Sequence, residues 1–343
     1  MPGPTGREVR EVTSTNGHSS GPSAIDQFLA AMRDKDIDID EPIVADGKLH
    51  RYHAVGDKKH ARNAWAKLVI DDRPAGMFGC NRRYTGQRFS WKMEGGRPLT
   101  ESERSDLREK ARLRAEQRER EDALHEAAAA RRALEWYEAA QSVTSHPYLT
   151  AKGVPSFEKL RVGPWHYFDE ETGEYVQSHS NALIVPIMDP KKRIHSLQGI
   201  MLDEEGNFQK RYLRDGAKDG HLLSIGRPKD NVLLICEGIA TGLSLWKCTG
   251  HAVIVAFDTS NLLPVARVVR AWGGSEYRIL ICADNDQWTE KPTKNPGMHY
   301  AKAAALAIAA DVVQPEFQDT AAKPTDFNDL HCPRGRIDRA TEN

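Results

Sequence analysis

The sequence predicts an α/β protein, α+β overall, whose C-terminal part forms a parallel sheet flanked by helices. Three patterns support this fold class. From residue 231 onward, apolar runs of strand length alternate with segments of helical length, as in βαβ units. A stretch rich in Glu, Arg, Ala and Leu over 98–142 indicates one long helix. Shorter strand-like runs precede it, which indicates a separate β-rich module.

The N-terminal module is predicted over residues 23–96, after a polar leader. Residues 1–22 are rich in Gly, Ser, Thr and Pro and have almost no apolar content, so we expect disorder there. Within the module, a helix is predicted at 24–33 and a strand at 65–70.

Three aromatic residues of this module allow two interpretations: Trp65, Phe78 and Trp91. They could stack on the bases of single-stranded nucleic acid. Small β modules also use such aromatics as their only core, and we favour the core.

A helical connector is predicted over residues 97–144. Thr100 followed by Glu103 fits a capping box that opens the helix. Its apolar positions are too sparse for a steady heptad seam, so we expect a long solvated helix rather than a coiled coil. A nucleic-acid-binding arm is the weaker alternative, because acidic residues are interspersed throughout.

A mixed region is predicted over residues 145–229. It should contain paired strands at 182–187 and 194–201, joined by the turn Asp189-Pro190-Lys191-Lys192. This pairing gives the region an antiparallel character that the following part of the chain lacks.

The parallel sheet is predicted within residues 230–334, and a flexible tail over 335–343. The alternation implies right-handed crossovers between its strands. Its elements are strands at 231–236, 253–257 and 277–283 and helices at 239–248, 262–272 and 298–312.

Composition excludes several classes of protein. The formal net charge of −1 excludes a general polycation, so any nucleic-acid surface must be a local patch. The five cysteines form no C-x-x-C pair, which argues against a zinc ribbon or a disulfide framework. His50, His53, His60 and Cys80 could form a metal site, but their irregular spacing favours ordinary residues, and no zinc is expected. No membrane-length run or signal peptide is seen, which predicts a cytoplasmic protein without a membrane partner.

Acidic residues follow the predicted parallel strands at the point where each strand ends. Glu237 follows 231–236, and Asp284 and Asp286 follow 277–283. The C-terminal edge of an open α/β sheet is where ligands bind, and converging carboxylates suit Mg²⁺ or Mn²⁺. One such residue alone would more simply cap a loop or helix, but the combination favours a metal site for phosphoryl chemistry.

The predicted reaction is metal-assisted nucleotidyl transfer. Asp284 and Asp286 would hold the metal, and Glu237 would be a further ligand or would accept the proton of an attacking 3′-hydroxyl. Gly238 is expected to allow a sharp turn and a close approach of phosphate to the backbone. Asp258, after the strand at 253–257, is a candidate to support the metal ligands.

The two acidic strand ends and their βαβαβ setting resemble a Toprim domain, which bacterial-type primases, topoisomerases and some nucleases share. The segment Thr325-Asp326-Phe327-Asn328-Asp329-Leu330-His331 is similar to an element of phage- and plasmid-encoded Toprim primases. Residues 181–199 resemble the subdomain that precedes Toprim in the bacterial replicative primase. The sequence is thus identified as resembling a Toprim primase of mobile-element type over about residues 45–335.

The resemblance implies a DNA primase that makes short primers on single-stranded DNA from nucleoside triphosphates. Asp326 and Asp329 would then lie near the metals. The candidates for nucleotide or nucleic-acid binding are Lys192, Arg193, Lys210, Arg211 and Lys218. For these basic residues, a solvated hairpin face is the alternative interpretation.

Two other functions stay open at this stage. The same domain serves nucleases that act on DNA or RNA, and a non-catalytic single-stranded-DNA-binding accessory is the third possibility. A replicative helicase or single-strand-binding protein would be supplied separately, because no G-x-x-x-x-G-K-[ST] loop occurs. Template preference, ribo- versus deoxyribonucleotide use, oligomeric state and the host element are not encoded in any pattern that we recognise.

Overall fold

The computed structural model describes residues 23–58, 61–71, 73–84, 87–93, 100–290 and 293–332. The predicted leader and tail lie outside these residues. The chain divides into two compact units, Met1–Glu103 and Arg104–Asn343, and we describe each by itself. Among the described helices, none combines the length and the apolar character that crossing a membrane requires.

Within residues 23–93, the described part of the first unit contains helix α1 and an antiparallel sheet of four strands, in the order β1-β2-β3-β4. Helix α1 begins where predicted, because Ser23 and Asp26 form a reciprocal capping box. The elements are α1 (Ala24–Arg33), β1 (His50–Tyr52), β2 (Ala64–Val69), β3 (Ala75–Cys80) and β4 (Phe89–Lys92).

Aromatic rings form the core of this sheet. Phe28 of α1 meets Phe78 at a ring-centroid distance of 5.5 Å and Trp91 at 5.3 Å, both edge to face. The core interpretation is confirmed for Phe78, which is buried, and the half-buried Trp91 packs against the same core. Trp65 is also half-buried, and its ring covers the backbone of Gly79, where an added Cβ would lie 2.6 Å away.

The predicted long helix is α2 (Glu101–Ala139). Its capping box is confirmed, since the Thr100 amide donates to Glu103 Oε2 at 2.8 Å and the Glu103 amide donates to Thr100 Oγ1 at 3.3 Å. The fully buried residues of the helix are Ala129 and Ala133. These two share a cluster with Trp165 of the following sheet, so only the C-terminal part of α2 packs on it.

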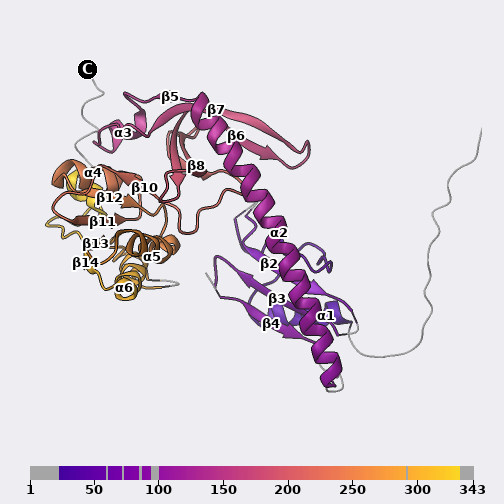
Figure 1. Cartoon of the computed structure of the whole chain (residues 1–343). Coiled ribbons are helices and arrows are strands. Elements are labelled where there is room, and N and C mark those ends of the chain that lie inside the picture. Colours follow the sequence, from indigo (N-terminus) through magenta and orange to yellow (C-terminus); the bar gives the residue numbers. More distant parts are fainter. Residues whose placement is uncertain are drawn as a thin grey trace, which may run out of the picture. The chain divides into compact units, whose positions relative to one another are not determined.

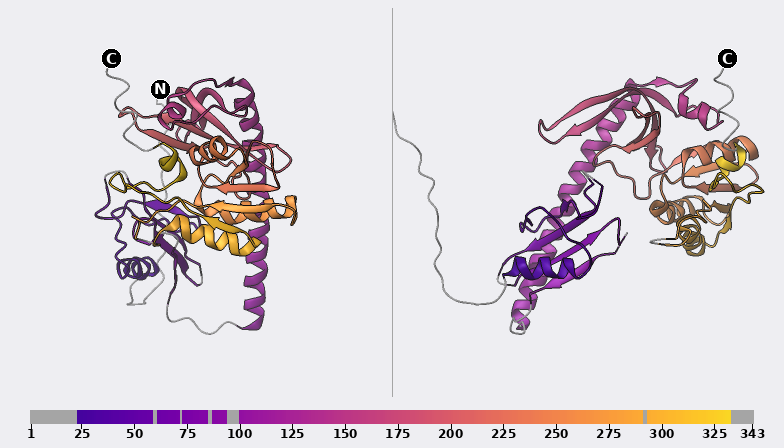
Figure 2. Two further views of the ribbon diagram at one scale, coloured as in Figure 1. Left: turned by 90° about the vertical axis from the view of Figure 1, so that its left-hand side faces the viewer. Right: turned by 180° about the vertical axis from the view of Figure 1, so that it is seen from behind.

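The second unit begins with an antiparallel sheet in chain order, β5 to β9. The predicted pairing is confirmed, with Leu183 opposite Ile200 and Ile187 opposite Ser196. The β6–β7 hairpin extends beyond the other strands (Figure 2). The elements are β5 (Gln141–Ser142), α3 (Pro147–Ala151), β6 (Arg161–Asp169), β7 (Glu174–Met188), β8 (Ile194–Leu202) and β9 (Phe208–Tyr212).

A second, mostly parallel sheet follows in the order β10-β12-β11-β13-β14. Strands β11, β12 and β13 are parallel, as predicted. Strand β14, which was not predicted, is parallel to β13, and β10 runs antiparallel to β12. Figure 1 shows α4 on one face and α5 and α6 on the other. The strands are β10 (Leu223–Ile225), β11 (Val232–Cys236), β12 (Ala252–Val255), β13 (Arg278–Cys282) and β14 (Asp311–Val313). The helices are α4 (Ile239–Thr249), η1 (Thr259–Asn261), α5 (Leu262–Gly273), α6 (Pro296–Ile308) and α7 (Phe327–His331).

The predicted helix at 298–312 was wrong at its end. Helix α6 stops at Ile308, Ala309 takes the left-handed conformation with φ 50°, and the chain then forms β14. Arg270 of α5 donates to the carbonyl oxygens of Ile308 and Ala309. These bonds satisfy the helix end, so a tertiary contact overrides the local alanine-rich pattern.

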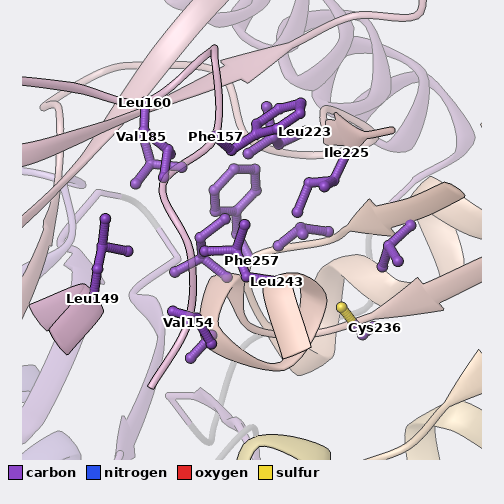
Figure 3. Close-up of a cluster of buried hydrophobic side chains, with 14 of the residues drawn as sticks. Leu149, Val154, Phe157, Leu160, Val185, Leu223, Ile225, Cys236, Leu243 and Phe257 are labelled. Atoms are coloured by element: carbon purple, nitrogen blue, oxygen red, sulfur yellow. The ribbon is translucent and has the colours of Figure 1, made fainter. Parts of the chain in front are cut away.

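One apolar core joins the two sheets of the second unit. Figure 3 shows Phe157, Val185 and Leu223 converging with Leu243 and Phe257. Strand β7 is buried on both faces over its last seven residues, because α2 covers one face and this core covers the other. The shared core fixes β9 beside the ends of the parallel strands.

Candidate active site

The predicted carboxylates lie at the C-terminal edge of the parallel sheet. Cys236 and Cys282 are opposite each other as the last residues of β11 and β13. Glu237 directly follows the first of these strands, and Asp284 comes two residues after the end of the second. The structure therefore brings Glu237 and the Asp-x-Asp segment to one place.

Glu237 is held by the segment that follows β12. Its carbonyl oxygen accepts a hydrogen bond from the Phe257 amide at 2.7 Å, and Thr259 Oγ1 donates to its Oε2 at 3.0 Å. Phe257 has φ 74°, a strained backbone conformation for a bulky residue. The pKa of Glu237 is raised to about 7, because burial, with the charges of Asp286 and Asp258, outweighs the lowering by the Thr259 hydrogen bond.

Asp284 has a buried side-chain oxygen that receives no hydrogen bond from the described residues. Burial raises its pKa well above the ordinary value, and the nearby charges of Glu237 and Asp326 add to the effect. Its Oδ1 is buried and has no hydrogen-bond partner among the described residues. A buried acceptor without a donor is costly, which suggests that a cation belongs there.

The start of α6 fixes the Asp-x-Asp segment. Asp286 Oδ2 accepts a hydrogen bond from the Gly297 amide at 3.0 Å, and Asn295 Nδ2 donates to Asn285 Oδ1 at 2.8 Å. A Cβ on Gly297 would lie 2.3 Å from the Asp284 carbonyl oxygen. Gly297 is thus required by close packing, and the sequence interpretation missed it although Asn-Pro-Gly is a readable helix start.

The late acidic segment lies against the same edge. Asp326 caps α7, and its Oδ1 accepts from the Asp329 amide at 2.7 Å. Burial raises the pKa of Asp326, and its charge contributes to the raised pKa of Asp284. Asp329 instead accepts a hydrogen bond from the Thr325 amide. The carbonyl oxygen of Thr325 in turn accepts a hydrogen bond from the Asn285 amide at 2.6 Å. Asp326 therefore faces the cluster, and Asp329 holds the loop beside it.

Lys210 is the basic candidate that reaches the carboxylates. Burial lowers its pKa, and Lys152 lowers it further, while Glu237, Asp326 and Asp284 act in the opposite direction. Lys152 ends α3, and its carbonyl accepts from Asn328 Nδ2 at 2.7 Å. The sequence interpretation missed Lys152, because nothing local connects it to strands about 80 residues away.

Lys218 also lies at this edge, bound to the carboxylate of Asp258. Burial alone would raise the pKa of Asp258, but hydrogen bonds from Lys218 and Ser260 outweigh it, and the pKa is lowered. Asp258 is thereby engaged with a lysine, which leaves it less suited to a metal.

Three other basic candidates are not brought to the carboxylates. Arg193 forms an ion pair with Asp189 of its own turn. Lys192 lies in the same turn near Lys159, whose pKa is lowered by burial and by the charge of Lys192. Arg211 neighbours Lys210 along β9, so it points to the opposite face of the sheet. There it lines a cavity of about 690 Å³ with Trp165 and Arg214.

A domain family and several known proteins are similar to this chain. Residues 232–336 match the model of the Toprim domain. This part of the chain is a Toprim domain. Two curated Escherichia coli proteins, both named DNA primase TraC, are each 29% identical to this chain over 283 residues. The matches cover 81% and 80% of this chain but only 18% and 24% of those proteins, so the chain spans about a fifth of their length.

Solved primase structures are also similar to this chain. A DNA primase domain from Pseudomonas aeruginosa has 18% identity and a TM-score of 0.40, covering 61% of this chain and 73% of that chain. The DnaG primase catalytic domain bound to ssDNA has 14% identity and a TM-score of 0.41, covering 61% and 77%. The Aquifex aeolicus primase, with zinc binding and RNA polymerase domains, has 12% identity and a TM-score of 0.41, covering 90% and 82%.

The chain bends at Glu237 and Gly238, between β11 and α4, as predicted. Gly238 is the N-cap of α4, and its φ of −99° and ψ of 153° are extended. Any residue adopts this conformation, so the bend does not require a glycine. A Cβ here would meet only Thr241 Oγ1, at 3.9 Å, so the backbone is open, and close phosphate approach stays a prediction.

The donor set of the Toprim domain suits a hard divalent cation. Within the described residues, no three His, Cys, Asp or Glu side chains are arranged to hold a metal by themselves. Mg²⁺ commonly takes only one or two protein carboxylates and completes its shell with water and substrate phosphates. Asp284, with its orphaned oxygen, and Asp286 fit that requirement.

The histidine and cysteine residues considered for zinc have other partners. His50 Nε2 lies 2.8 Å from Asp46 and His53 Nδ1 3.1 Å from Asp40. Cys80 is buried in the core of the first unit. His60 lies outside the described residues.

Proposed function

We propose that this chain carries the catalytic region of a DNA primase of the phage or plasmid type. The observation that carries this proposal is the meeting of half-buried carboxylates at one sheet edge with the side chain of Lys210 from the preceding sheet, whose charge interacts with Glu237, Asp284 and Asp326. The similarity to the two proteins named DNA primase TraC supports primase chemistry over the other uses of a Toprim domain. Its substrates would be nucleoside triphosphates and single-stranded DNA.

In this proposal Asp284 and Asp286 hold Mg²⁺ or Mn²⁺. The bound metal would neutralise charge that builds on the phosphate oxygens. Lys210 supplies a fixed positive charge beside the carboxylates and binds phosphate. Thr259 and Asp329 keep the cluster in place, because Thr259 donates to Glu237 and Asp329 holds the loop that contacts the Asn285 amide.

Glu237 has two possible roles, and they can be separated. As a metal ligand, its loss in Glu237→Gln would be compensated by more Mn²⁺. As the acceptor of the 3′-hydroxyl proton, its loss would persist at every Mn²⁺ concentration. A titration of primer synthesis against Mn²⁺ in wild type and Glu237→Gln therefore assigns the role.

The partners follow from this chemistry. A helicase or a single-strand-binding protein would deliver the template, and a cytoplasmic location agrees with replication. Both remain part of the proposal. The first unit has no assigned role.

A primer-synthesis assay tests the function. The protein is incubated with single-stranded DNA, labelled ribonucleotides and Mn²⁺, beside Asp284→Ala and the control Asp311→Ala, whose carboxylate is exposed at the opposite sheet edge. Labelled oligomers from wild type and Asp311→Ala, but not from Asp284→Ala, are expected. Shortening of the template would indicate a nuclease, and binding without chemistry a replication accessory.

A further inference from the structure

Asn261 connects the end of β12 to a loop that comes from the other sheet. Its side chain is buried, with 1% of its surface exposed. Asn261 Oδ1 accepts from the Gly220 amide at 2.8 Å. Its Nδ2 lies 2.9 Å from the carbonyl oxygen of Lys218 and 3.0 Å from that of His221. One carboxamide thus binds three backbone groups of a four-residue loop.

A fourth contact anchors the carboxamide to the Toprim sheet. Nδ2 also lies 2.8 Å from the carbonyl oxygen of Ala256. Nδ2 carries two hydrogens, so one of its three contacts is shared. The Asn261 amide in turn donates to Asp258 Oδ1 at 3.0 Å. Asn261 therefore fixes the positions of both the loop and the Asp258 carboxylate that the loop faces.

The loop presents Lys218 at the entrance to the carboxylates. Lys218 Nζ binds Asp258 and lies 4.8 Å from the ring centroid of Tyr212. About a third of each charged side chain is exposed, 32% for Lys218 and 27% for Asp258. Tyr212 donates to the carbonyl of Phe257 at 3.0 Å, the residue whose amide donates to Glu237. The ammonium is thus fixed and still accessible to an anion.

We propose that Asn261 is a positioning residue that holds Lys218 where it receives the phosphate oxygens of a nucleoside triphosphate. This inference rests on the proposed function. Asp258 acts as the partner of Lys218 before substrate arrives, because its Oδ2 contacts that lysine and its Oδ1 is occupied by Ser260 and Asn261. A lysine is a common phosphate-binding residue, acting as a point charge.

The chemistry of the position explains why an asparagine is needed. Three of the four contacts require a donor, because they are carbonyl oxygens, and one requires an acceptor. Aspartate has the same shape but no donor, and serine has the donor but not the reach. Asn261→Asp and Asn261→Ser therefore disturb the loop in two different ways.

The test measures binding of inorganic tripolyphosphate with Mg²⁺ by calorimetry, which needs no turnover. The proteins compared are wild type, Asn261→Asp, Asn261→Ser, Lys218→Ala and the double variant Asn261→Ser/Lys218→Ala. Asn63→Asp is the matched control, since Asn63 is a half-buried amide of the first unit that donates to Asp57. The melting temperature of each variant is recorded beside its affinity.

We expect each single variant to weaken binding about tenfold, the loss of roughly one hydrogen bond to a charged group. The double variant should be no weaker than Lys218→Ala, because Asn261 acts through Lys218. A loss of stability alone would lower the melting temperature and leave the affinity of the folded protein unchanged. Unaltered affinity in both Asn261 variants, or additive losses in the double variant, would overturn the inference.

The inference and the proposed function can fail separately. Wild type that binds tripolyphosphate through Lys218 and Asn261 but makes no primers would overturn the primase proposal and leave this inference standing. Wild type that makes primers while both Asn261 variants bind normally would overturn this inference alone.

Discussion

The two edges of the parallel sheet handle charge in opposite ways. At the C-terminal edge, Glu237 and Asp284 are half-buried near each other, and burial raises the pKa of both. At the N-terminal edge, Arg278 and Asp311 form an ion pair at 3.2 Å with 70% and 63% of their side chains exposed. The same sheet thus carries crowded, partly desolvated carboxylates at one edge and a balanced solvated ion pair at the other.

This difference separates function from stability. Exposed ion pairs contribute little to folding, whereas crowded buried carboxylates oppose it. A cluster that costs stability is retained only where it serves another purpose, so the C-terminal edge is the place for a binding site. Each prediction below changes one edge and leaves the other intact.

The largest effect is expected for Asp284→Ala. Primer synthesis should fall by at least about 10³-fold, as for the loss of a central electrostatic contributor. The free energy of unfolding should stay equal or rise by about 1 kcal/mol, because a buried like charge disappears. Activity assays and chemical denaturation without metal check both parts, and a large loss of stability would contradict the interpretation of an unbalanced cluster.

Gly297→Ala should damage the same edge through packing. The new Cβ would meet the Asp284 carbonyl oxygen at 2.3 Å, so we expect a destabilisation of about 2–3 kcal/mol and a marked loss of activity. Gly238→Ala is the matched glycine, with open space around its Cβ. Thermal denaturation should show it to be as stable as wild type, while a loss of its activity would support phosphate approach at that backbone.

These glycines show what the sequence could and could not predict. The strand ends of Glu237 and the Asp-x-Asp segment were predictable, because apolar runs followed by acidic residues are local patterns. The importance of Gly297 depends on a contact with a loop that precedes it by more than ten residues. Local pattern shows a helix start there but not which backbone lies against it.

The register of β9 determines which of its basic residues faces the carboxylates. Lys210 is opposite Ile200 and Arg211 is opposite Gly199, so one faces the carboxylates and the other the cavity behind. A shift of one residue would exchange them. The sequence analysis placed Lys210 and Arg211 in one group, because it did not predict the strand that pairs with β9. It assigned no role to Lys152, Thr259 or Asn261, because their contacts with the site come from distant parts of the chain.

The metal-free protein should lose stability as pH rises through the range of Glu237. Its folded pKa of about 7 lies above 4.5, the ordinary value of a glutamate, so the folded state binds more protons than the unfolded state between these two pH values. The stability that this group contributes is therefore greatest below pH 4.5, and it falls by roughly 3 kcal/mol up to pH 7. Denaturation with EDTA at several pH values measures this slope.

Two comparisons sharpen that pH experiment. Glu237→Gln should flatten the slope, because the titrating group is gone. Mg²⁺ should reverse it, since the metal binds the ionised carboxylates and stabilises the folded state more as pH rises. An equal slope in wild type and Glu237→Gln would mean that other groups control the pH dependence.

The smallest effect is expected at the opposite edge. Asp311→Ala removes one partner of an exposed pair, so the free energy of unfolding should change by less than about 0.5 kcal/mol, and primer synthesis should be unchanged. High salt should erase even that difference, because exposed pairs are screened. A loss of activity comparable to that of Asp284→Ala would mean that the two edges are not functionally distinct, and the division between them would have to be abandoned.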